Sequence, residues 1–288
     1  MSRRREKWSK KLLRAALRAT SLEHRFADYR KRVDRIGAVD RQNQLLLMLA
    51  WRAHIGPPIS WLDVEFRSFS QNGEDGVLVY LFSRIGMESR RCVEIGCGSG
   101  IECNTANLIL NHGFLGLMVD AREKRIELGR RFYAKCRDSS ARPPQLVHAW
   151  ASRANIETIL RERNCEGSID LLSIDLDGVD YWIWEAIQCV EPRVVVIEYN
   201  SSFPATQAVT VEYADDYQAV GEKINGASLA ALVKLGQRKG YRLVGCERRR
   251  VNAFFVRRGI GEEEFPEVDP ELFCSAPPRA LPSGWVEV

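Results

Sequence analysis

The segment Arg91 to Ile101, RCVEIGCGSGI, constrains the fold more than any other part of the sequence. Its apolar beginning, 92–95, predicts a buried strand, and the glycines that follow predict a sharp turn into a helix that opens near Asn104. Glycine permits such a turn because it has no Cβ. The N–H groups of the turn and of the helix N-terminus then face an anionic or strongly polar ligand. The segment therefore predicts a strand, turn and helix that bind a ligand.

The spacing of the glycines narrows the choice of ligand. Gly96, Gly98 and Gly100 form G-x-G-x-G, and Ile101 stands where the dinucleotide pattern G-x-G-x-x-G has its last glycine. Glu94 also lies two residues before the first glycine, where an enzyme that binds a nicotinamide cofactor usually has an apolar residue. The pattern therefore disfavours NAD.

The next predicted strand, 116–119, ends in an acidic residue. Asp120 follows the glycine turn by about half of a βαβ unit, so it is placed to accept hydrogen bonds from a ribose diol, with Ala121 beside it. The glycine turn, Asp120 and the spacing between them together resemble the S-adenosylmethionine (SAM) site of a class I methyltransferase. The alternative is a glycine turn that only packs a helix against a strand.

Strand and helix patterns alternate along most of the chain and predict an α/β fold. We expect a doubly wound, mostly parallel, seven-stranded sheet of the Rossmann-like, class I methyltransferase type, with one antiparallel strand and an N-terminal helical extension. The expected strands are 92–95, 116–119, 146–150, 170–174, 193–197, 241–246 and 252–257, and the charged helical run 122–131 is expected to be a solvated face.

Three domains are expected from breaks in this pattern. Residues 1–58 form a basic helical extension, with a helix over 5–53, and the glycine and prolines at 56–58 mark its end. Residues 59–260 form the methyltransferase domain, in which 201–227 is an insertion or lid over the substrate. A proline-rich tail, 261–288, wraps around the outside.

Composition points to a reducing compartment. The eight cysteines form no C-x-x-C pair, and the four histidines share no ligand spacing with them, so disulfides and zinc are disfavoured. The sequence has no apolar run of about 18 residues, which excludes a membrane-spanning helix. We expect a cytoplasmic protein, although the arginine-rich first residues also resemble an organellar transit peptide.

The net charge of +4 is concentrated in the first forty residues. A solvated helix face is the simplest interpretation of this basic arm. Homo-oligomer formation through the N-terminal helices and binding of an acidic partner are the alternatives.

Further cofactor contacts are expected around the glycine turn. Gln71 lies in SQNGED, where Ser70 is placed to cap a helix that would pack over the turn, and capping alone also explains that segment. Ser99 and Asn104 lie in the turn and at the next helix. Trp150 and Ala151 end the third strand, where a flat apolar surface suits adenine, although Trp150 as ordinary core is an alternative.

Oxygen-bearing side chains follow the fourth and fifth strands, and parallel strands bring them to one crevice. Asp175, Asp177, Asp180 and Asn200 are the catalytic candidates, and Asp175, Glu198 and Asn200 are the candidate ligands of Mg²⁺ or another divalent cation. One carboxylate acting as general base without a metal, and carboxylates that only bind loop amides, remain alternatives.

Five segments together resemble the FkbM-like branch of class I SAM-dependent methyltransferases, over about residues 68 to 258. They are SQNGED (70–75), VEIGCGSGIECNTANLI (93–109), LLSIDLDGVDYWIWEAI (171–187), VVVIEYN (194–200) and GASLAALVKLGQRKGYRLVG (226–245). The resemblance implies O-methylation of a sugar, polyketide or other natural product. Relatives often have Ala and Asp where this chain has Cys97 and Ser99.

The predicted function is therefore SAM-dependent O-methylation of a small-molecule or glycosylated acceptor. A SAM-binding module without turnover is the alternative, against which the retained acids speak, because a dead site has no reason to keep carboxylates that repel each other. RNA methylation is less favoured: the fourth strand continues as Asp175, Leu176, Asp177, Gly178, not as the N/D-P-P-Y/F tetrapeptide used to methylate bases. Nucleic acid is therefore not an expected partner.

Overall fold

The computed structural model describes residues 37–136, 139, 141–218 and 226–288. The chain divides into two compact units, Met1–Leu47 and Met48–Val288. Residues 37–53 are helical, as predicted, and the rest of the helix expected over 5–53 lies outside the described residues. The domain boundaries expected at 58 and 260 stay predictions.

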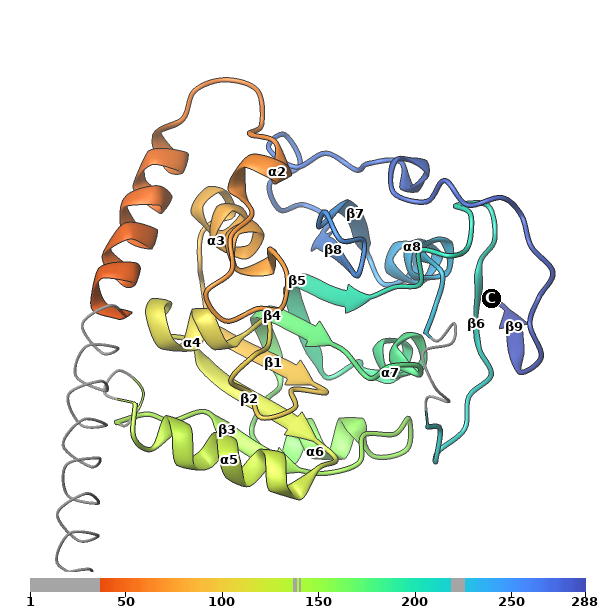
Figure 1. Ribbon diagram of the computed structural model, residues 1–288, viewed down its shortest axis with the longest axis horizontal. Helices are drawn as coiled ribbons and strands as arrows, with labels where there is room; N and C mark the ends of the chain where they lie inside the picture. The colour runs from red at the N-terminus through yellow and green to blue at the C-terminus, as the bar shows by residue number, and fades with distance from the viewer. Residues whose placement is uncertain (1–36, 137–138, 140, 219–225) are drawn as a thin grey trace, which may run out of the picture. The chain divides into compact units, whose positions relative to one another are not determined.

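One seven-stranded sheet forms the centre of the second unit (Figure 1). Its strand order is β3-β2-β1-β4-β5-β8-β7; the first five strands are parallel to one another, and β8 is antiparallel to both β5 and β7. This arrangement confirms the predicted doubly wound, mostly parallel sheet. The strands are β1 (Arg91–Ile95), β2 (Leu115–Asp120), β3 (Gln145–His148), β4 (Gly167–Ile174), β5 (Val190–Glu198), β7 (Tyr241–Cys246) and β8 (Asn252–Arg257).

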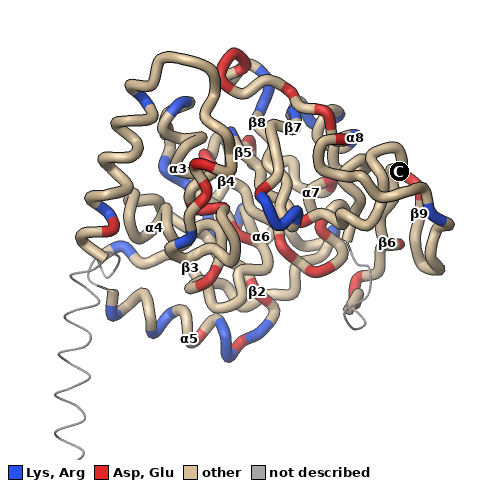
Figure 2. The backbone as a smooth tube through the Cα atoms, turned by 45° about the horizontal axis from the view of Figure 1, so that its top comes forward, with Lys and Arg blue, Asp and Glu red and all other residues tan. Residues whose placement is uncertain are grey.

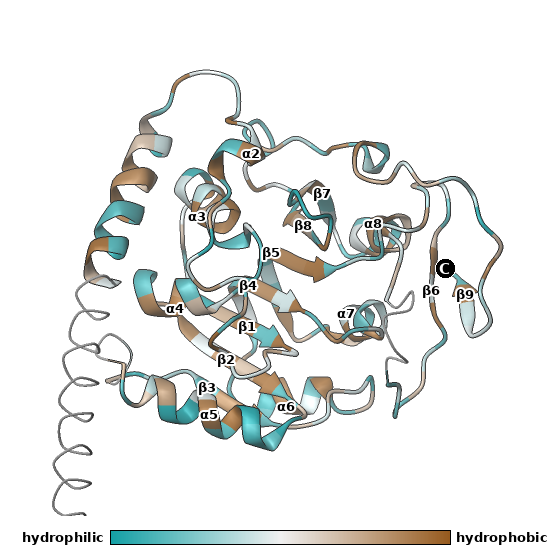
Figure 3. Cartoon of the chain, in the orientation of Figure 1, coloured by the Kyte–Doolittle hydropathy of each residue, from teal (hydrophilic) through white to brown (hydrophobic). Residues whose placement is uncertain are grey.

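Helices cover both faces of the sheet, because successive side chains of each strand point to opposite faces and both sets are apolar. In β5, Val195 and Ile197 join one apolar cluster with α6, α7 and α8, whereas Val194 and Val196 join a second with α3, α4 and α5. Figure 3 shows the part of β5 that carries these residues coloured as hydrophobic. The helices are α2 (Trp61–Val64), α3 (Glu74–Ile85), α4 (Ala106–His112), α5 (Glu123–Tyr133), α6 (Ile156–Glu162), α7 (Asp180–Ala186) and α8 (Leu229–Arg238).

Helix α3 begins later than the predicted cap requires. Its N-cap is Gly73, which has no side chain, so the expectation that Ser70 is the N-cap residue was wrong. The buried carboxylate of Asp75 instead accepts the N–H groups of Ser68, Phe69 and Ser70 at 2.6–2.8 Å. Ser70 still satisfies one first-turn donor, because its Oγ accepts the N–H of Asp75 at 3.1 Å. The loop before α3 is therefore folded around a helix side chain.

The insertion and the tail contain structure that the sequence does not predict. Strand β6 (Val209–Val211) pairs antiparallel with β9 (Trp285–Glu287), and a 3₁₀ turn, η1, covers Pro270–Leu272. Phe203 packs with these two strands in a small apolar cluster of its own. Strands of three residues are too short to show an alternating pattern, which explains why the sequence gives no sign of them.

Charged residues line the outer face of α5, as Figure 2 shows. Lys124, Arg125, Arg130 and Arg131 are exposed, and this confirms the predicted solvated face. Among the described residues, no helix combines the length and the apolar composition that a bilayer crossing requires.

A buried ion pair joins the sheet to the turn that follows α3. Arg193 Nη1 lies 3.0 Å from Asp170 Oδ1, with side chains only 3% and 0% exposed. Asp170 also accepts the N–H groups of Glu88 and Arg90, and Arg193 donates to the carbonyl of Gly86 at 2.7 Å. Both charges therefore have several partners, which is the condition under which a buried pair is tolerated.

We expect Asp170→Ala to lower the free energy of unfolding by about 3–5 kcal/mol, because it removes the buried counter-ion of Arg193 and leaves only the exposed Glu88, 3.2 Å away, to pair with it. Urea unfolding followed by circular dichroism measures this change. Glu166→Ala, which breaks a solvent-exposed pair with Arg161, is the control and should have a much smaller effect. Equal effects of the two substitutions would contradict the role given to the buried pair.

Candidate cofactor and acceptor site

The turns after β1 and β4 are in direct contact. Gly96 has a φ of +88°, and a Cβ at this position would lie 1.7 Å from the carbonyl oxygen of Asp175. The Gly96 N–H donates to Val119 at 2.8 Å, and the Asp175 N–H donates to Ile95 at 2.9 Å. Only glycine fits at residue 96. Because it has no side chain, β1, β2 and β4 can end at one edge of the sheet.

Asp120 holds the glycine turn. Its carboxylate, 4% exposed, accepts the N–H of Gly98 at 2.8 Å and both the N–H and the guanidinium of Arg122 at 2.8–2.9 Å. Burial acts to raise the pKa of Asp120, but the hydrogen bonds and charge of Arg122 outweigh it and hold the pKa below its usual value. Asp120 is therefore ionised, which suits a carboxylate that is expected to accept hydrogen bonds from the two hydroxyl groups of a ribose.

Glu94 supports the turn from beneath. Its buried carboxylate accepts the Thr105 N–H at 2.8 Å, the Asn104 N–H at 3.4 Å and the Ser173 hydroxyl at 2.9 Å. Burial raises the pKa of Glu94 despite these donors. The side chain of Asn104 in turn donates to Ser173 Oγ at 3.1 Å. Glu94 and Asn104, both predicted to contact the cofactor, thus fix the start of α4 and also face the site.

An apolar pocket of about 240 Å³ opens beside Asp120. Trp150 is 45% exposed there, and its indole N–H donates to the carbonyl of Asp215 at 2.6 Å, so the alternative in which Trp150 is ordinary core was wrong. The predicted cofactor residues that line this pocket are Gly96, Asp120, Ala121, Trp150, Ala151 and Asp175.

The insertion supplies one wall of the apolar pocket. Tyr217 packs over Gly178, where a Cβ would lie 2.1 Å from its ring. Tyr213, from the same segment, accepts the N–H of Arg153 through its hydroxyl at 2.8 Å. The guanidinium of Arg153 lies 5.1 Å from the ring centre of Trp182 and 5.3 Å from that of Tyr213. The described part of the insertion therefore packs against the loops that carry the site.

A polar pocket of about 180 Å³ adjoins the apolar one, because Gly96, Arg122, Asp175 and Asp177 line both. Four further predicted cofactor residues line it: Gln71, Glu94, Gly98 and Asn104. Ser99 lines neither pocket. Its carbonyl oxygen would lie 2.1 Å from a Cβ on Gly129, so this part of the turn packs against α5. The cofactor contact expected of Ser99 stays a prediction.

Three acids meet where the two pockets join. Asp175, Asp177 and Glu198 each place a carboxylate oxygen within 4.8 Å of the others. Burial, followed by the charges of neighbouring acids, raises the pKa of Asp175 to about 7 and that of Glu198 to about 9. Glu198 therefore keeps a proton at neutral pH and shares it with Asp175 through a hydrogen bond. Three oxygen ligands so close together fit a hard divalent cation.

Two further predicted members make hydrogen bonds of their own. Asp180 is fully buried, and its two oxygens accept the N–H groups of Leu176 and Gly178 at 2.7 and 2.9 Å, so it shapes the acidic loop. Its charge acts on Asp175 and Glu198, and its catalytic role stays a prediction. Asn200 Oδ1 accepts the N–H of Ser202 at 2.9 Å, and its catalytic and metal-binding roles stay predictions.

No family model matches the chain, and a search of curated proteins finds no relative. Solved structures do resemble it. A SAM-dependent methyltransferase from Aquifex aeolicus is 10% identical, with a TM-score of 0.34 over 59% of this chain and 83% of that one. The methyltransferase domain of bacterial CtHen1-CN is 14% identical, with a TM-score of 0.40 over 63% and 96%. The glycopeptide N-methyltransferase MtfA is 14% identical, with a TM-score of 0.42 over 68% and 94%.

The strand order places an antiparallel β8 between β5 and β7 at one end of a parallel sheet. This is the class I methyltransferase fold. In that fold the crevice lies at the carboxyl ends of the strands, near the point where the strand order reverses between β1 and β4. Both pockets of this chain lie there.

Sequence reasoning missed several residues of this crevice, among them Arg122, which lines both pockets. Glu74, Arg125 and Asn252 line the polar pocket, and Tyr217 lines the apolar one. Asn252 begins β8 and is the register partner of Glu198, so the pairing of β8 with β5 would have revealed it. Tyr217 lies in a segment without periodicity, and no pattern in the sequence points to it.

The acid cluster should make stability depend on pH. Because the folded-state pKa of Glu198 lies above its unfolded value, its contribution is complete below about pH 4.5 and is lost as pH rises towards about 9. We expect Glu198→Gln, which keeps a neutral side chain, to flatten the fall in the free energy of unfolding between pH 5 and pH 9. Urea unfolding across this range measures it.

The exposed acid Glu162 in α6 offers a matched control. Glu162→Gln should leave the slope of stability against pH unchanged. An unchanged slope in Glu198→Gln as well would show that the cluster is ionised in the folded protein.

Proposed function

We propose that this chain is a SAM-dependent methyltransferase that transfers a methyl group to an oxygen of a small-molecule or glycosylated acceptor. The observation that carries the proposal is an apolar pocket, lined by an ionised Asp120, that joins a polar pocket. SAM has the same succession of parts, because a flat adenine is followed by a ribose diol and then by a charged amino acid. The fold itself is compatible with other activities, so the argument rests on the site.

Each part of SAM has residues of matching chemistry in the crevice. Trp150 and Ala121 offer apolar surface to adenine, and Asp120 accepts from the ribose hydroxyls. Gln71 and Glu94 line the polar pocket, which suits the ammonium group of the methionine end.

The ribose would replace Arg122 on Asp120. The guanidinium of Arg122 now takes two hydrogen-bonding positions of the Asp120 carboxylate. The side chain of Arg122 is 56% exposed, so its guanidinium can be hydrated once the ribose hydroxyls donate to Asp120 in its place. The hydrogen bond from the Gly98 N–H to Asp120 can remain during this exchange, so Asp120 continues to hold the glycine turn.

When bound, SAM supplies a methyl group on a sulfonium leaving group. The chain then has to orient the acceptor oxygen and receive its proton. Asp175 lies at the junction of the two pockets, and its pKa of about 7 suits a general base near neutral pH. The alternative use of the same acids is to hold Mg²⁺ or a similar cation through Asp175, Asp177 and Glu198. Such a cation acts as a Lewis acid that lowers the pKa of a hydroxyl bound to it.

The cofactor is tested by titrating the purified protein with SAM and with NAD⁺ in a calorimeter. We expect SAM to bind and NAD⁺ not to bind. Asp120→Ala should weaken SAM by about 1–3 kcal/mol, which is roughly a 5- to 150-fold rise in Kd, because hydrogen bonds to a charged acceptor are lost. Asp63→Ala removes an exposed acid of α2 and serves as the control.

Binding of NAD⁺ without SAM would overturn the proposal. Incubation with SAM and a panel of hydroxylated acceptors, followed by mass spectrometry for an added methyl group, separates an enzyme from a module that only binds SAM.

The metal is tested without reference to activity. We expect Mg²⁺ or Mn²⁺ titrated into the protein to bind with a stoichiometry of one, and Asp177→Asn to weaken binding by about tenfold or more through loss of one charged ligand. Affinity should rise with pH as Glu198 loses its proton. Asp63→Asn should bind the ion like the wild type. The absence of saturable binding at pH 8 would favour the metal-free base.

A further inference from the structure

Acids and cations are unevenly distributed in the crevice. The acids that line its polar pocket are Glu74, Glu94, Glu102, Asp175 and Asp177. Among the described residues, the cations that line either pocket are Arg122 and Arg125, both at the beginning of α5. An anionic group that enters the crevice is repelled by the acids and attracted by these two arginines.

The two guanidinium groups lie over the glycine turn. A Cβ at Gly98 would be 3.6 Å from Arg125 Nη1 and 3.8 Å from Arg122 Nη2. Both groups therefore approach the same point of the backbone. A carboxylate placed there has guanidinium donors on two sides, and hydrogen bonds between such charged groups are stronger than those between neutral ones.

The two arginines differ in the partners they already have. Arg122 donates to Asp120 at 2.9 Å through both Nε and Nη2, the place that the ribose is proposed to take. Within the described part of the chain, no carboxylate oxygen lies within 4.0 Å of the guanidinium of Arg125, and its side chain is exposed. Arg125 is therefore a cation at the rim of the polar pocket that no acid of the protein neutralises.

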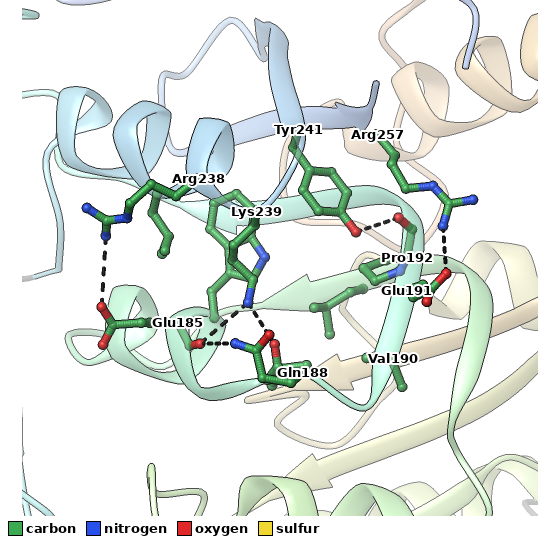
Figure 4. Close-up of a pocket in the computed structure, with 13 residues that line it drawn as sticks. Glu185, Gln188, Val190, Glu191, Pro192, Arg238, Lys239, Tyr241 and Arg257 are labelled. Carbon is green, nitrogen blue, oxygen red and sulfur yellow. Dashed lines mark hydrogen bonds and ion pairs between the residues drawn. The ribbon is translucent and has the colours of Figure 1, made fainter. Parts of the chain in front are cut away.

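The cations of a separate cavity provide a contrast. This cavity, of about 580 Å³, lies beside the ends of α7 and α8 and shares no lining residue with the crevice (Figure 4). In it, Arg257 lies 3.1 Å from Glu191, and Lys239 donates to the carbonyl of Ile187 at 2.7 Å. These cations are bound to the protein itself, whereas Arg125 is not.

SAM carries charges of both signs at its methionine end. The sulfonium and ammonium groups are positive and suit the acids of the polar pocket. The carboxylate is negative and requires cations. Ammonium and carboxylate are attached to the same carbon atom, so the polar pocket has to supply acids and cations side by side. It does so where Arg122 and Arg125 meet the acids that line the same pocket.

We infer that Arg125 binds the carboxylate of the methionine end of SAM, joined by Arg122 once the ribose has replaced Arg122 on Asp120. The inference rests on the proposed function and adds a means of discrimination to it. Decarboxylated SAM lacks this carboxylate and therefore carries one more net positive charge. The acids alone would bind decarboxylated SAM at least as tightly as SAM, whereas the two arginines reverse this preference.

Calorimetry with SAM and decarboxylated SAM tests the inference. We expect the wild type to bind SAM at least about tenfold more tightly, as hydrogen bonds between charged groups predict. Arg125→Gln removes the charge of an exposed side chain, so the variant should fold. It should weaken SAM by about tenfold without weakening decarboxylated SAM, and a general disturbance of the crevice would weaken both.

A matched control is the neighbouring residue of α5. Lys124 is exposed and lines neither pocket, so Lys124→Gln makes the same change of charge without the proposed contact. It should leave the ratio of the two dissociation constants at its wild-type value. A long-range effect of charge would appear in both variants, so the difference between them measures the contact of Arg125.

Three results would overturn the inference and leave the proposed function standing. They are binding of decarboxylated SAM by the wild type as tightly as SAM, a wild-type ratio in Arg125→Gln, and equal changes of the ratio in Arg125→Gln and Lys124→Gln. Failure of the wild type to bind SAM would instead overturn the proposed function, and this inference with it.

Discussion

The contact between Gly96 and the carbonyl oxygen of Asp175 is the constraint on which the rest of the crevice depends. It brings the turns after β1 and β4 closer than any side chain at residue 96 would allow. The two strands are neighbours at the point where the strand order reverses, so no helix lies between their ends. The acidic loop therefore comes to lie beside the glycine turn, and the apolar and polar pockets share a boundary.

Electrostatics then distinguish the acids of the crevice. Asp120 is paired with a guanidinium, Glu94 with donors at the start of α4, and Asp180 with two loop N–H groups. These contacts hold the pKa of Asp120 below its usual value, whereas burial still raises the pKa of Glu94 and of Asp180. Burial and the charges of neighbouring acids also raise the pKa of Asp175 to about 7 and that of Glu198 to about 9, so the acids of this cluster are not fully compensated. A proton or a cation is needed between Asp175 and Glu198 to offset the repulsion of their charges. This requirement makes the pair suited to proton transfer or to metal binding.

The sequence predicts most of the sheet because β-strands buried on both faces appear as continuous apolar runs, and the carboxyl ends of parallel strands meet at one edge. Asp120, Trp150 and Asp175 could be placed on this basis. Ser99 and Asn200 could not, because the direction of a side chain in a turn depends on contacts with distant elements. Ser99 turns against α5, and the Asn200 side chain binds its own loop. Strands β6 and β9 are too short for their periodicity to be detected.

Helix α7 connects the two polar regions of the molecule. It has only seven residues, a length at which few internal hydrogen bonds form and a helix is not stable alone. At its first residue, Asp180 binds the acidic loop of the crevice, and at its last turn Lys239 of the neighbouring segment binds the free carbonyls. Between these ends, Ile183 and Trp184 are buried against the sheet. The position of α7 is therefore set by side chains at both ends, and the geometry of the acidic loop at one edge of the sheet depends on packing that extends to the other.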